Sequence, residues 1–445
     1  MTQPFVYVNI PLENKTGPAM GLPRRPPGGE ERIDMTVGIR HDDLRRRNRA
    51  LVISAVRRSG QPSRTDIAGS SGLSHSTISA ISADLIAEGV LIETKSAEMP
   101  AARRGRPQVA LSLNPDAASV VSVVLSLNVV SASLMDYTGR VVAEQHLRLS
   151  TLTLPRDELV EAVISATRGV IEHATEGAPP SRLTLAVQGI TDSDATTLLW
   201  SPITPHSDVP FGDLLEAEFG LPVTVQNDCN MIAEALRWRA PERYKDDFYA
   251  ILLSNGIGMG LMLRGRLFTG THSSGGEFGH MVHIPDGALC RCGRRGCIEA
   301  YAGNYAVLRN ARGGDPLDIP MADIGDEEMQ ALADAAREHD GPERAAFRAA
   351  GEAIGFGLGS LFALFDPAPV AIVGHGALAF DIVEPAIHEA IARTAGGRHA
   401  AAISFDTQPN EKPLIRDGSA MTALLLLDED VFAAGGSVVE SRKIA

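Results

Sequence analysis

One histidine and three cysteines place the tightest constraint on how this chain folds. His280 precedes Cys290, Cys292 and Cys297, and the segment that joins them is rich in glycine. One imidazole and three thiolates are the four ligands of a closed tetrahedral zinc site, which leaves no position for water. The sequence therefore predicts a structural Zn²⁺ that orders this loop, held by His280, Cys290, Cys292 and Cys297. Reduced thiols without a metal are the alternative.

The length and composition describe a globular protein of two or three domains. The chain has 445 residues, of which 44% are apolar and 22% charged, and its four cysteines are too few for a disulfide scaffold. Cys229 stands apart from the others and is expected to be a buried small residue. No apolar run approaches the ~18 to 20 residues that a bilayer span needs, and the first forty residues lack the pattern of a secretory signal. We expect a cytoplasmic protein without a membrane partner.

Charge is distributed unevenly along the chain, whose formal net charge is -14. Residues 41–110 contain eleven Lys or Arg against seven Asp or Glu, a net charge of +4, and residues 1–40 contain five against four, a net +1. Residues 111–445 therefore carry the remaining -19. A basic module attached to an acidic body favours a protein that binds nucleic acid through one part only.

Residues 42–89 carry the signals of three short helices. The first covers 42–60, with an acidic start and a glycine stop, and its apolar group consists of Leu51, Val52, Ile53 and Val56. Ser63 and Asp66 form a capping-box pattern for the second helix. Ser74 can cap the third, whose apolar residues recur at helical spacing, namely Ile78, Ile81, Leu85 and Ile86.

This order of helices, with a glycine-containing turn before the third, is that of a helix-turn-helix motif. The last helix of such a motif lies in the major groove of DNA, and its first residues meet the base edges. The candidate DNA-binding residues are therefore His75, Ser76, Thr77 and Ser79. A three-helix protein-interaction module with a solvated run of charge is the alternative.

Two short strands, at 90–94 and 109–113, follow the helices and flank an arginine-rich loop. This arrangement is typical of a winged helix-turn-helix, in which loop arginines contact phosphates or a narrow minor groove. The wing adds three candidate DNA-binding residues, Arg103, Arg104 and Arg106. The DNA-binding domain is predicted to span residues 41–114.

The acidic body alternates between strands and helices. A meander is expected over 120–127, 132–135 and 141–147, with a turn at 136–139, and is followed by a helix at 156–174 and a strand at 183–187. A helix at 212–219, a strand at 223–226 and a helix after Asp228 come next. This order predicts α/β layers. A glycine-spaced apolar helix that includes 360–364 is expected in the core, with a dimer contact as the alternative.

Asn227 and Asp228 fall where a strand ends and a helix begins. In open α/β sheets ligands gather at the carboxyl ends of strands, and an asparagine amide can both donate and accept hydrogen bonds. Taken alone, such a pair is more often a helix cap. Other parts of the sequence are needed to choose between a ligand site and a helix cap.

The segment from Gly276 to Glu299, with its Gly-Glu-Phe-Gly-His start and its cysteine cluster, resembles the signature of the ROK family (repressor, open reading frame, kinase). The resemblance covers nearly all of residues 43–430 and includes the glycine-rich stretches 256–260 and 365–376. It implies an α/β body at 118–430 with the two-lobed actin-like ATPase fold of sugar kinases. The winged helix-turn-helix domain before that body marks the transcriptional regulators of the family.

By this resemblance a sugar site is lined by Asn227, Asp228, Glu277, His280 and Glu299. Carboxylates and amides suit a sugar because neighbouring hydroxyl groups need paired acceptors and donors, and a buried polar site rejects ligands that leave its groups unpaired. In the kinases of the family, the residue that matches Asp228 acts as general base on a sugar hydroxyl. Ile203 departs from the kinase pattern, which has Ser-Pro-Asn where this chain has Ser201-Pro202-Ile203.

Three loops that hold the phosphates of ATP in the kinases of the family differ in this chain. Ser-Leu-Asn-Val-Val at 126–130 replaces Asp-x-Gly-Gly-Thr, Ser-Asn-Gly at 254–256 replaces Gly-Thr-Gly, and Gly-His-Gly at 374–376 replaces Gly-Gly-Gly. Phosphoryl transfer depends on cradling and neutralising phosphates. The changes favour a sugar sensor without catalytic residues, and an active sugar kinase with altered phosphate loops is the alternative.

The sequence therefore predicts a sugar-responsive DNA-binding transcriptional regulator, a repressor rather than an activator. Its expected partners are operator DNA and a sugar or sugar phosphate effector, and two-fold DNA sites predict a homodimer or homotetramer. A constitutive DNA-binding protein whose body only dimerises is a further alternative. Residues 1–40 are expected to form a disordered tail, and residues 434–445 a second tail.

Overall fold

The computed structural model describes residues 41–95, 109–172, 177–271, 273, 275–320 and 324–436. The expected N-terminal tail, the arginine-rich wing loop and most of the expected C-terminal tail lie outside these residues. The described residues from Asp42 onward belong to one compact unit, which contains all the elements below apart from His41. None of the described helices combines the length and the apolar character that crossing a lipid bilayer requires.

The N-terminal module has the predicted three helices and two strands, α1 (His41–Ser59), α2 (Arg64–Ser71), α3 (His75–Ala87), β1 (Leu91–Lys95) and β2 (Val109–Leu113). Ser63 accepts a hydrogen bond from the backbone N–H of Asp66, whose carboxylate accepts one from the N–H of Ser63, so the capping box is complete. Ser74 caps α3. The expectation for Leu51 was wrong, because this side chain is 39% exposed and lies off the face that positions 52, 53 and 56 share.

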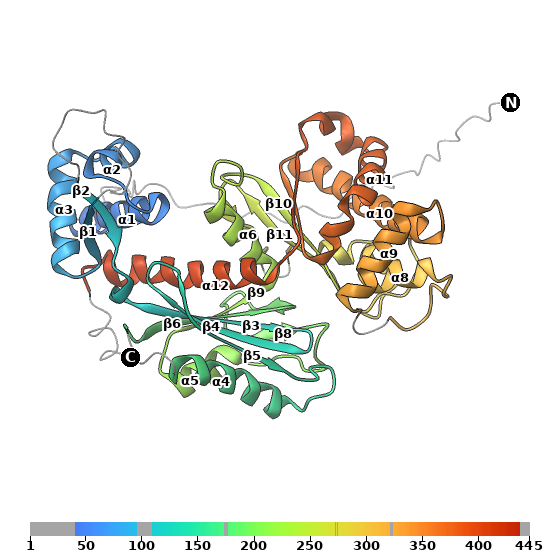
Figure 1. Ribbon diagram of the computed structural model, residues 1–445, viewed down its shortest axis with the longest axis horizontal. Coiled ribbons are helices and arrows are strands. Elements are labelled where there is room, and N and C mark those ends of the chain that lie inside the picture. The colour runs from blue at the N-terminus through green and yellow to red at the C-terminus, as the bar shows by residue number, and fades with distance from the viewer. Residues whose placement is uncertain are drawn as a thin grey trace, which may run out of the picture. The chain divides into compact units, whose positions relative to one another are not determined.

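The first layer of the body is a five-stranded sheet with the order β5 (Val141–Arg148), β4 (Val129–Asp136), β3 (Ser119–Ser126), β6 (Pro180–Val187) and β9 (Val223–Asn227). The first three form the predicted antiparallel meander, whereas β6 and β9 run parallel to β3. Two helices, α4 (Arg156–Glu172) and α5 (Phe211–Phe219), cover one face. The other face packs against α12 (Lys412–Leu427), as Figure 1 shows.

The second layer is a five-stranded sheet with the order β12 (Arg266–Leu267), β11 (Ile257–Leu263), β10 (Phe248–Leu253), β13 (Val370–Val373) and β14 (Phe405–Gln408). Helical elements accompany it, namely α6 (Asp228–Arg239), α7 (Glu299–Ala302), α8 (Asn304–Ala311), α9 (Asp326–Glu338), α10 (Pro342–Phe365) and α11 (Phe380–Ala392). A small hairpin joins β7 (Ile190–Thr191) to β8 (Leu198–Trp200). The two sheets and their helices fulfil the prediction of an α/β body.

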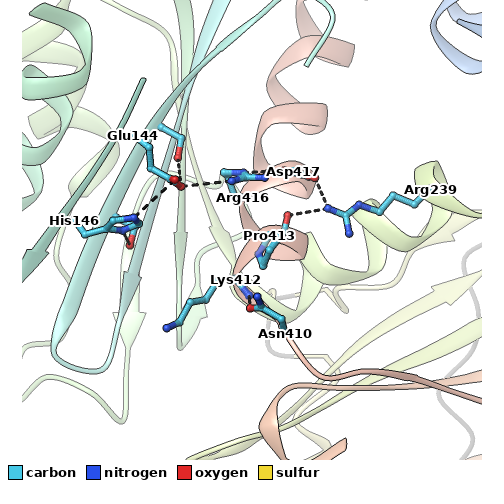
Figure 2. Close-up of polar contacts among 10 residues, drawn as sticks. Glu144, His146, Arg239, Asn410, Lys412, Pro413, Arg416 and Asp417 are labelled. Carbon is cyan, nitrogen blue, oxygen red and sulfur yellow. Dashed lines mark hydrogen bonds and ion pairs between the residues drawn. The ribbon is translucent and has the colours of Figure 1, made fainter. Parts of the chain in front are cut away.

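Helices α6 and α12 pack together in the core between the two sheets, where one buried cluster takes side chains from both helices and both sheets. The helices approach backbone to backbone, since a Cβ on Gly418 would lie 1.8 Å from the carbonyl oxygen of Met231. Figure 2 shows that the start of α12 forms ion pairs on two sides. Arg416 lies 3.5 Å from Glu144 of β5, and Arg239 of α6 pairs with Asp417.

The chain leaves α12 through a π-helical turn, η5 (Asp428–Phe432), which returns to the N-terminal module. Phe432 and the end of α12 join α1, α2, α3 and the start of β3 in one hydrophobic cluster. In the glycine-spaced helix α10, Leu361 and Phe362 are buried as the core expectation requires, while Leu364 is 74% exposed; the alternative of a dimer contact stays a prediction.

Candidate functional site

A narrow cavity opens between the two sheets, beside the ends of β9 and β10. Its empty space is about 600 Å³ including the opening to solvent. The five residues predicted to bind sugar all line this cavity, although they come from three separate segments, namely Asn227, Asp228, Glu277, His280 and Glu299. The cavity is thus lined by carboxylates, an amide and an imidazole at close range.

The cavity wall also contains residues that sequence reasoning missed, among them Gln188, Trp200, Asn230 and Ser273. The Trp200 ring meets the His280 imidazole edge to face, with 6.1 Å between the ring centres. Ile203, at the position where the kinases of the family have an amide, is instead buried in the core beneath the first sheet. A tryptophan directly before the Ser-Pro turn is the signal that could have pointed to the aromatic part of this wall.

Asn227 is both a cavity residue and a helix cap. Its side-chain oxygen accepts hydrogen bonds from the backbone N–H groups of Cys229 at 2.9 Å and Asn230 at 3.1 Å, and its amide donates to the carbonyl oxygen of Gly189 at 2.8 Å. Satisfying the free N–H groups at a helix start is the ordinary role of such a residue. Its capacity for a ligand is therefore reduced to the second amide hydrogen.

Asp228 is buried at the first turn of α6. Burial raises the pKa of its carboxyl to about 7, and the nearby Glu277 contributes to the rise, while a hydrogen bond from the N–H of Cys229 opposes it. A carboxyl with a pKa close to neutral can take up or release a proton under cellular conditions. The group can therefore accept from a ligand hydroxyl, or donate to it, at small cost.

Glu277 and Glu299 bring two further carboxylates into the same wall. Burial raises the pKa of Glu277, with Glu299 adding to the rise and His280 opposing it. Glu299 is held on both sides, because one oxygen accepts from the N–H of Ile257 at 3.1 Å and the other from the Tyr305 hydroxyl at 3.3 Å. Glu277 is therefore the freer of the two for a ligand.

The four residues predicted to bind zinc lie together, with their ligand atoms all within 4.8 Å of one another. The distance from Cys290 Sγ to His280 Nδ1 is 3.8 Å, and so is that from Cys292 Sγ to Cys297 Sγ. Two Zn–S bonds of about 2.3 Å at a tetrahedral angle separate their sulfur atoms by about 3.8 Å. The geometry and the donor atoms thus fit a tetrahedral zinc ion, and the cluster can hold a metal.

His280 connects the cluster to the cavity. Its Nδ1 faces Cys290, whereas its Nε2 lies 3.8 Å from a carboxylate oxygen of Glu277. A metal ligand that turns its second nitrogen to a carboxylate is held in one orientation by it. Burial raises the pKa of Cys290 and raises that of Cys297 to about 11, so a metal would have to displace protons from both thiols.

The predicted recognition residues lie at the start of α3. His75, Ser76 and Ser79 are exposed, whereas Thr77 is half-buried and its backbone N–H donates to the Ser74 cap at 3.1 Å. The hydroxyls of Ser76 and Thr77 also hydrogen-bond to that of Ser74, at 2.9 and 2.8 Å. The wing residues Arg103, Arg104 and Arg106 lie outside the described residues. His75 and Ser79 are therefore the freest of the predicted base-contacting side chains.

Most arginines of the described N-terminal module contact the protein itself, which the charge count could not reveal. Arg45 pairs with Asp84 at 2.8 Å, and Arg64 with Glu93 at 2.8 Å. The remaining contacts reach the end of the chain or α6, and are made by Arg46, Arg49, Arg57 and Arg58. Arg47 stays exposed. Two of these arginines, Arg46 and Arg57, are paired with acids outside the module, Asp430 and Asp428, so fewer of its arginines face outward than the sequence suggests.

A buried ion pair joins α1 to η5. The Arg57 guanidinium donates to both oxygens of Asp428, at 2.9 and 3.0 Å, and to the carbonyl oxygen of Tyr137. The Tyr137 hydroxyl donates to Asp428 at 2.5 Å. Burial lowers the pKa of Arg57, but Asp428 and Tyr137 more than compensate and raise it. Removing one partner of such a pair costs about 3 to 5 kcal/mol, so this contact holds the module firmly.

The three altered loops make contacts within the protein. Leu127 and Asn128 form a tight turn between β3 and β4, and the N–H of Asn128 donates to the Thr151 hydroxyl at 3.2 Å. A Cβ on Gly376 would lie 2.7 Å from Cβ of Leu253, so this glycine is required for packing. Asn255 accepts from the N–H of Ile324 at 3.3 Å. In each loop, contacts within the protein thus account for a residue that differs from the kinase pattern or that packs closely.

Comparison with known sequences gives related proteins over much of the chain. A xylose repressor of Caldicellulosiruptor bescii is 25% identical over 350 residues, which are 76% of this chain and 86% of that protein. A glucokinase of Streptomyces coelicolor is 30% identical over 245 residues, which are 53% of this chain and 77% of that enzyme. The sequence similarity therefore extends to both regulators and kinases.

Comparison with solved structures gives a related fold. The crystal structure of a ROK family transcriptional regulator, described as a homologue of the Escherichia coli MLC protein, matches with a TM-score of 0.71 at 22% identity. The match covers 90% of this chain and all of that one. The sequence pattern of the ROK family itself matches residues 125–415, which is more than half of the chain. The chain therefore belongs to the ROK family.

Proposed function

We propose that the protein is a sugar-responsive, DNA-binding transcriptional regulator that acts as a repressor. The observation that carries the proposal is the gathering of Asn227, Asp228, Glu277, His280 and Glu299 in one cavity. Buried carboxylates and amides that converge from separate segments suit a ligand with several hydroxyl groups. The relatedness to a xylose repressor supports a sugar as that ligand.

DNA binding is assigned to residues 41–114, and sugar binding to the body at 118–430. The capped helix α3 and the strands that follow it support the winged helix-turn-helix assignment. We propose that His75, Ser76, Thr77 and Ser79 meet base edges, and that Arg103, Arg104 and Arg106 of the wing contact phosphates. A DNA-binding regulator of this kind acts in the cytoplasm.

A structural zinc ion is assigned to His280, Cys290, Cys292 and Cys297. The donor set and its distances support this metal, since soft thiolates with one imidazole are typical of zinc. When bound, zinc would neutralise thiolates and join the ends of the loop. The role of His280 is then to orient Glu277 from its second nitrogen, so the metal shapes the cavity wall without contacting the sugar.

The packing of the three altered loops supports a protein without kinase activity. A second candidate, an active sugar kinase, is favoured by one observation, the pKa of about 7 that burial gives Asp228. A general base works best with a pKa near the operating pH. If the chain is a kinase, ATP, magnesium and a sugar panel will yield ADP, and Asp228→Asn will stop that reaction. ADP formation above the buffer rate would overturn the sensor assignment.

A homodimer or homotetramer is also proposed, because two-fold assemblies suit pseudo-palindromic DNA. The exposed apolar side chains Val282, Ile284 and Leu364 support an apolar contact face on the body. Sedimentation at micromolar concentration tests the proposal, for which the expected species has an even number of chains.

Thermal melting with a panel of free and phosphorylated aldoses, including D-xylose and D-glucose, tests the function. A ligand of the folded state raises the midpoint by mass action, by about 2.7 kcal/mol of stability at one hundred times its Kd. The active sugar should also change the affinity of the protein for a DNA duplex selected from a random library. No midpoint shift with any panel sugar would refute the assignment.

A further inference from the structure

Two consecutive arginines near the end of α1 fasten the N-terminal module to two different helices of the body. Arg57 enters the buried network with Asp428 and Tyr137 where α12 passes into η5. Arg58 places its guanidinium carbon 5.2 Å from the ring centre of Trp238, in the last turn of α6. Helix α1 therefore contacts both α6 and the end of α12, the two helices that lie between the sheets.

The two attachments differ in strength. The Arg57 side chain is 2% exposed and bonds to both carboxylate oxygens of Asp428, so losing a partner shifts the equilibrium several hundredfold or more. Arg58 is exposed, and an exposed cation–π contact contributes roughly 2- to 5-fold. The Nε1 of Trp238 is buried without an acceptor among the described residues, which a small rearrangement can relieve. The Arg57 attachment is therefore fixed, whereas the Arg58 contact can open.

Helix α6 runs from the cavity to this weaker contact. Its first residues, Asp228 and Asn230, line the cavity, and the helix is twelve residues long, about 18 Å. A Cβ on Gly260 of β11 would lie 2.2 Å from the carbonyl oxygen of Cys229, and one on Gly418 of α12 would lie 1.8 Å from that of Met231, so the first turn is packed closely against both elements. The backbone hydrogen bonds of a helix this short keep it straight, so a displacement of its first turn together with these elements also moves its far end.

The position of the cavity gives a reason for such a displacement. The first turn of α6 forms part of the cavity wall through Asp228 and Asn230. A sugar that occupies the cavity contacts this turn directly. A movement there reaches Trp238 and the Arg58 contact at the other end of the helix.

We propose that Arg58 and Trp238 are positioning residues, which transmit the occupancy of the cleft to the DNA-binding helices. Entry of a sugar moves α6 and alters the Arg58–Trp238 contact, while the Arg57–Asp428 pair stays closed and serves as the pivot. The inference rests on the proposed function, because it requires a sugar in this cavity. Coupling between two sites is typically 5- to 150-fold, a range that the exposed contact can supply in part without breaking the buried pair.

The two tryptophans of the chain allow a test by difference, in which Trp200 of the cavity wall is left in place. The emission change of the full-length chain minus that of its Trp238→Phe variant reports on Trp238, and it is measured together with the thermal midpoint in titrations with each panel sugar. A binding sugar should change both signals with one concentration dependence. Arg58→Met should abolish the emission change, and Arg58→Lys should restore it. Arg47→Met, which removes an exposed charge from the same helix, should behave like its parent.

A second measurement uses the chain with both tryptophans. The ratio of DNA Kd values with and without the sugar, on the duplex selected from a random library, should fall at least threefold in Arg58→Met and recover in Arg58→Lys. The midpoint shift caused by the sugar should stay the same in all three proteins. A purely structural role for Arg58 would lower stability without changing this ratio.

The outcomes separate the inference from the function on which it rests. A sugar that raises the midpoint but leaves Trp238 emission and the DNA ratio insensitive to Arg58→Met overturns the inference and leaves the sugar sensor standing. If no panel sugar raises the midpoint of the unaltered chain, the sugar sensor fails and the inference fails with it.

Discussion

The two sides of the cleft, that of α6 and that of the altered loops, differ in the polar groups that they bury. On the side of α6, the buried carboxylates of Asp228, Glu277 and Glu299 share one cavity, and burial raises the pKa of the first two. On the side of the altered loops, the contacts include a hydrogen bond at Asn128 and close packing of Gly376 on Leu253, and neither involves a buried carboxylate. Carboxylates that are buried close together lower the free energy of unfolding. Among the described residues these carboxylates gather on one side of the cleft, and the proposed sugar site gives a reason for this cost.

The metal cluster permits the strongest test of the α6 side. Cys292→Ser, or chelation, should remove one zinc per chain by elemental analysis, lower the thermal midpoint and abolish the response to sugar. Zinc contributes about 10 to 16 kcal/mol of binding free energy in small zinc-finger peptides, so we expect the largest effect here. Cys229→Ala, outside the cluster, is the control for metal content. A metal-free protein with a full sugar response would show that the cluster is not needed for the cavity to bind sugar.

The pH dependence of stability tests the cost of burying Asp228. The pKa of this group rises from its ordinary 3.8 to about 7 on folding, so the folded state holds a proton that the unfolded chain releases between those values. The free energy of unfolding therefore falls as pH rises through this window. Asp228→Asn removes the effect, and its stability relative to the parent should grow between pH 5 and 8 by about 2 to 3 kcal/mol.

Urea unfolding at the two pH values measures this difference, with the exposed Asp213→Asn as control. A parallel pH dependence in Asp228→Asn and the parent would mean that burying this carboxylate does not lower the free energy of unfolding. The two sides of the cleft would then not differ in the cost of their buried groups.

Glu277→Gln tests whether the α6 side binds its ligand through charge. A hydrogen bond to a charged group contributes about 1.5 to 3 kcal/mol, so calorimetry should show sugar affinity weakened by roughly 10- to 100-fold. Zinc content should not change. Glu389→Gln, which alters an exposed glutamate, is the control. Equal affinities in both variants would show that the charge of Glu277 does not contribute to sugar binding.

Gly376→Ala tests the side of the altered loops. Its Cβ would meet Leu253 at 2.7 Å, so overpacking should lower the free energy of unfolding by about 1 to 3 kcal/mol in urea. The affinity for sugar should stay the same. Gly325→Ala, at a position with nothing within 4 Å, is the matched control. A loss of sugar affinity without a loss of stability would assign the loop to a ligand after all.

Local signals explain why much of the fold was predictable. The caps at Ser63 and Ser74 and the alternation of 119–148 act within a few residues, so the helices and the meander follow from neighbours in sequence. The spacing of the cysteines likewise predicted that they form one cluster. The family resemblance supplied what spacing could not, namely that Glu277 and Asp228 meet across the cavity.

Long-range pairs could not be predicted in this way. Tyr137 was expected only as part of a turn, yet it is buried and bonds to Asp428 across 291 positions. The arginines of α1 contributed to a basic count, whereas Arg57 is neutralised by an acid 371 positions away. Composition reports how many charges a segment has, and only the fold decides whether they face solvent. The role of Trp200 was missed for the same reason, since neighbours in space decide it.

The shared core of the N-terminal helices and η5 has a consequence for biosynthesis. Val52 and Ile53 emerge from the ribosome long before Leu427 and Phe432, which belong to the same cluster. Domains usually fold in the order of their synthesis. Here the N-terminal helices complete their hydrophobic interior only after the body has been synthesised, so a chain cut before Asp428 would leave these helices without their anchor.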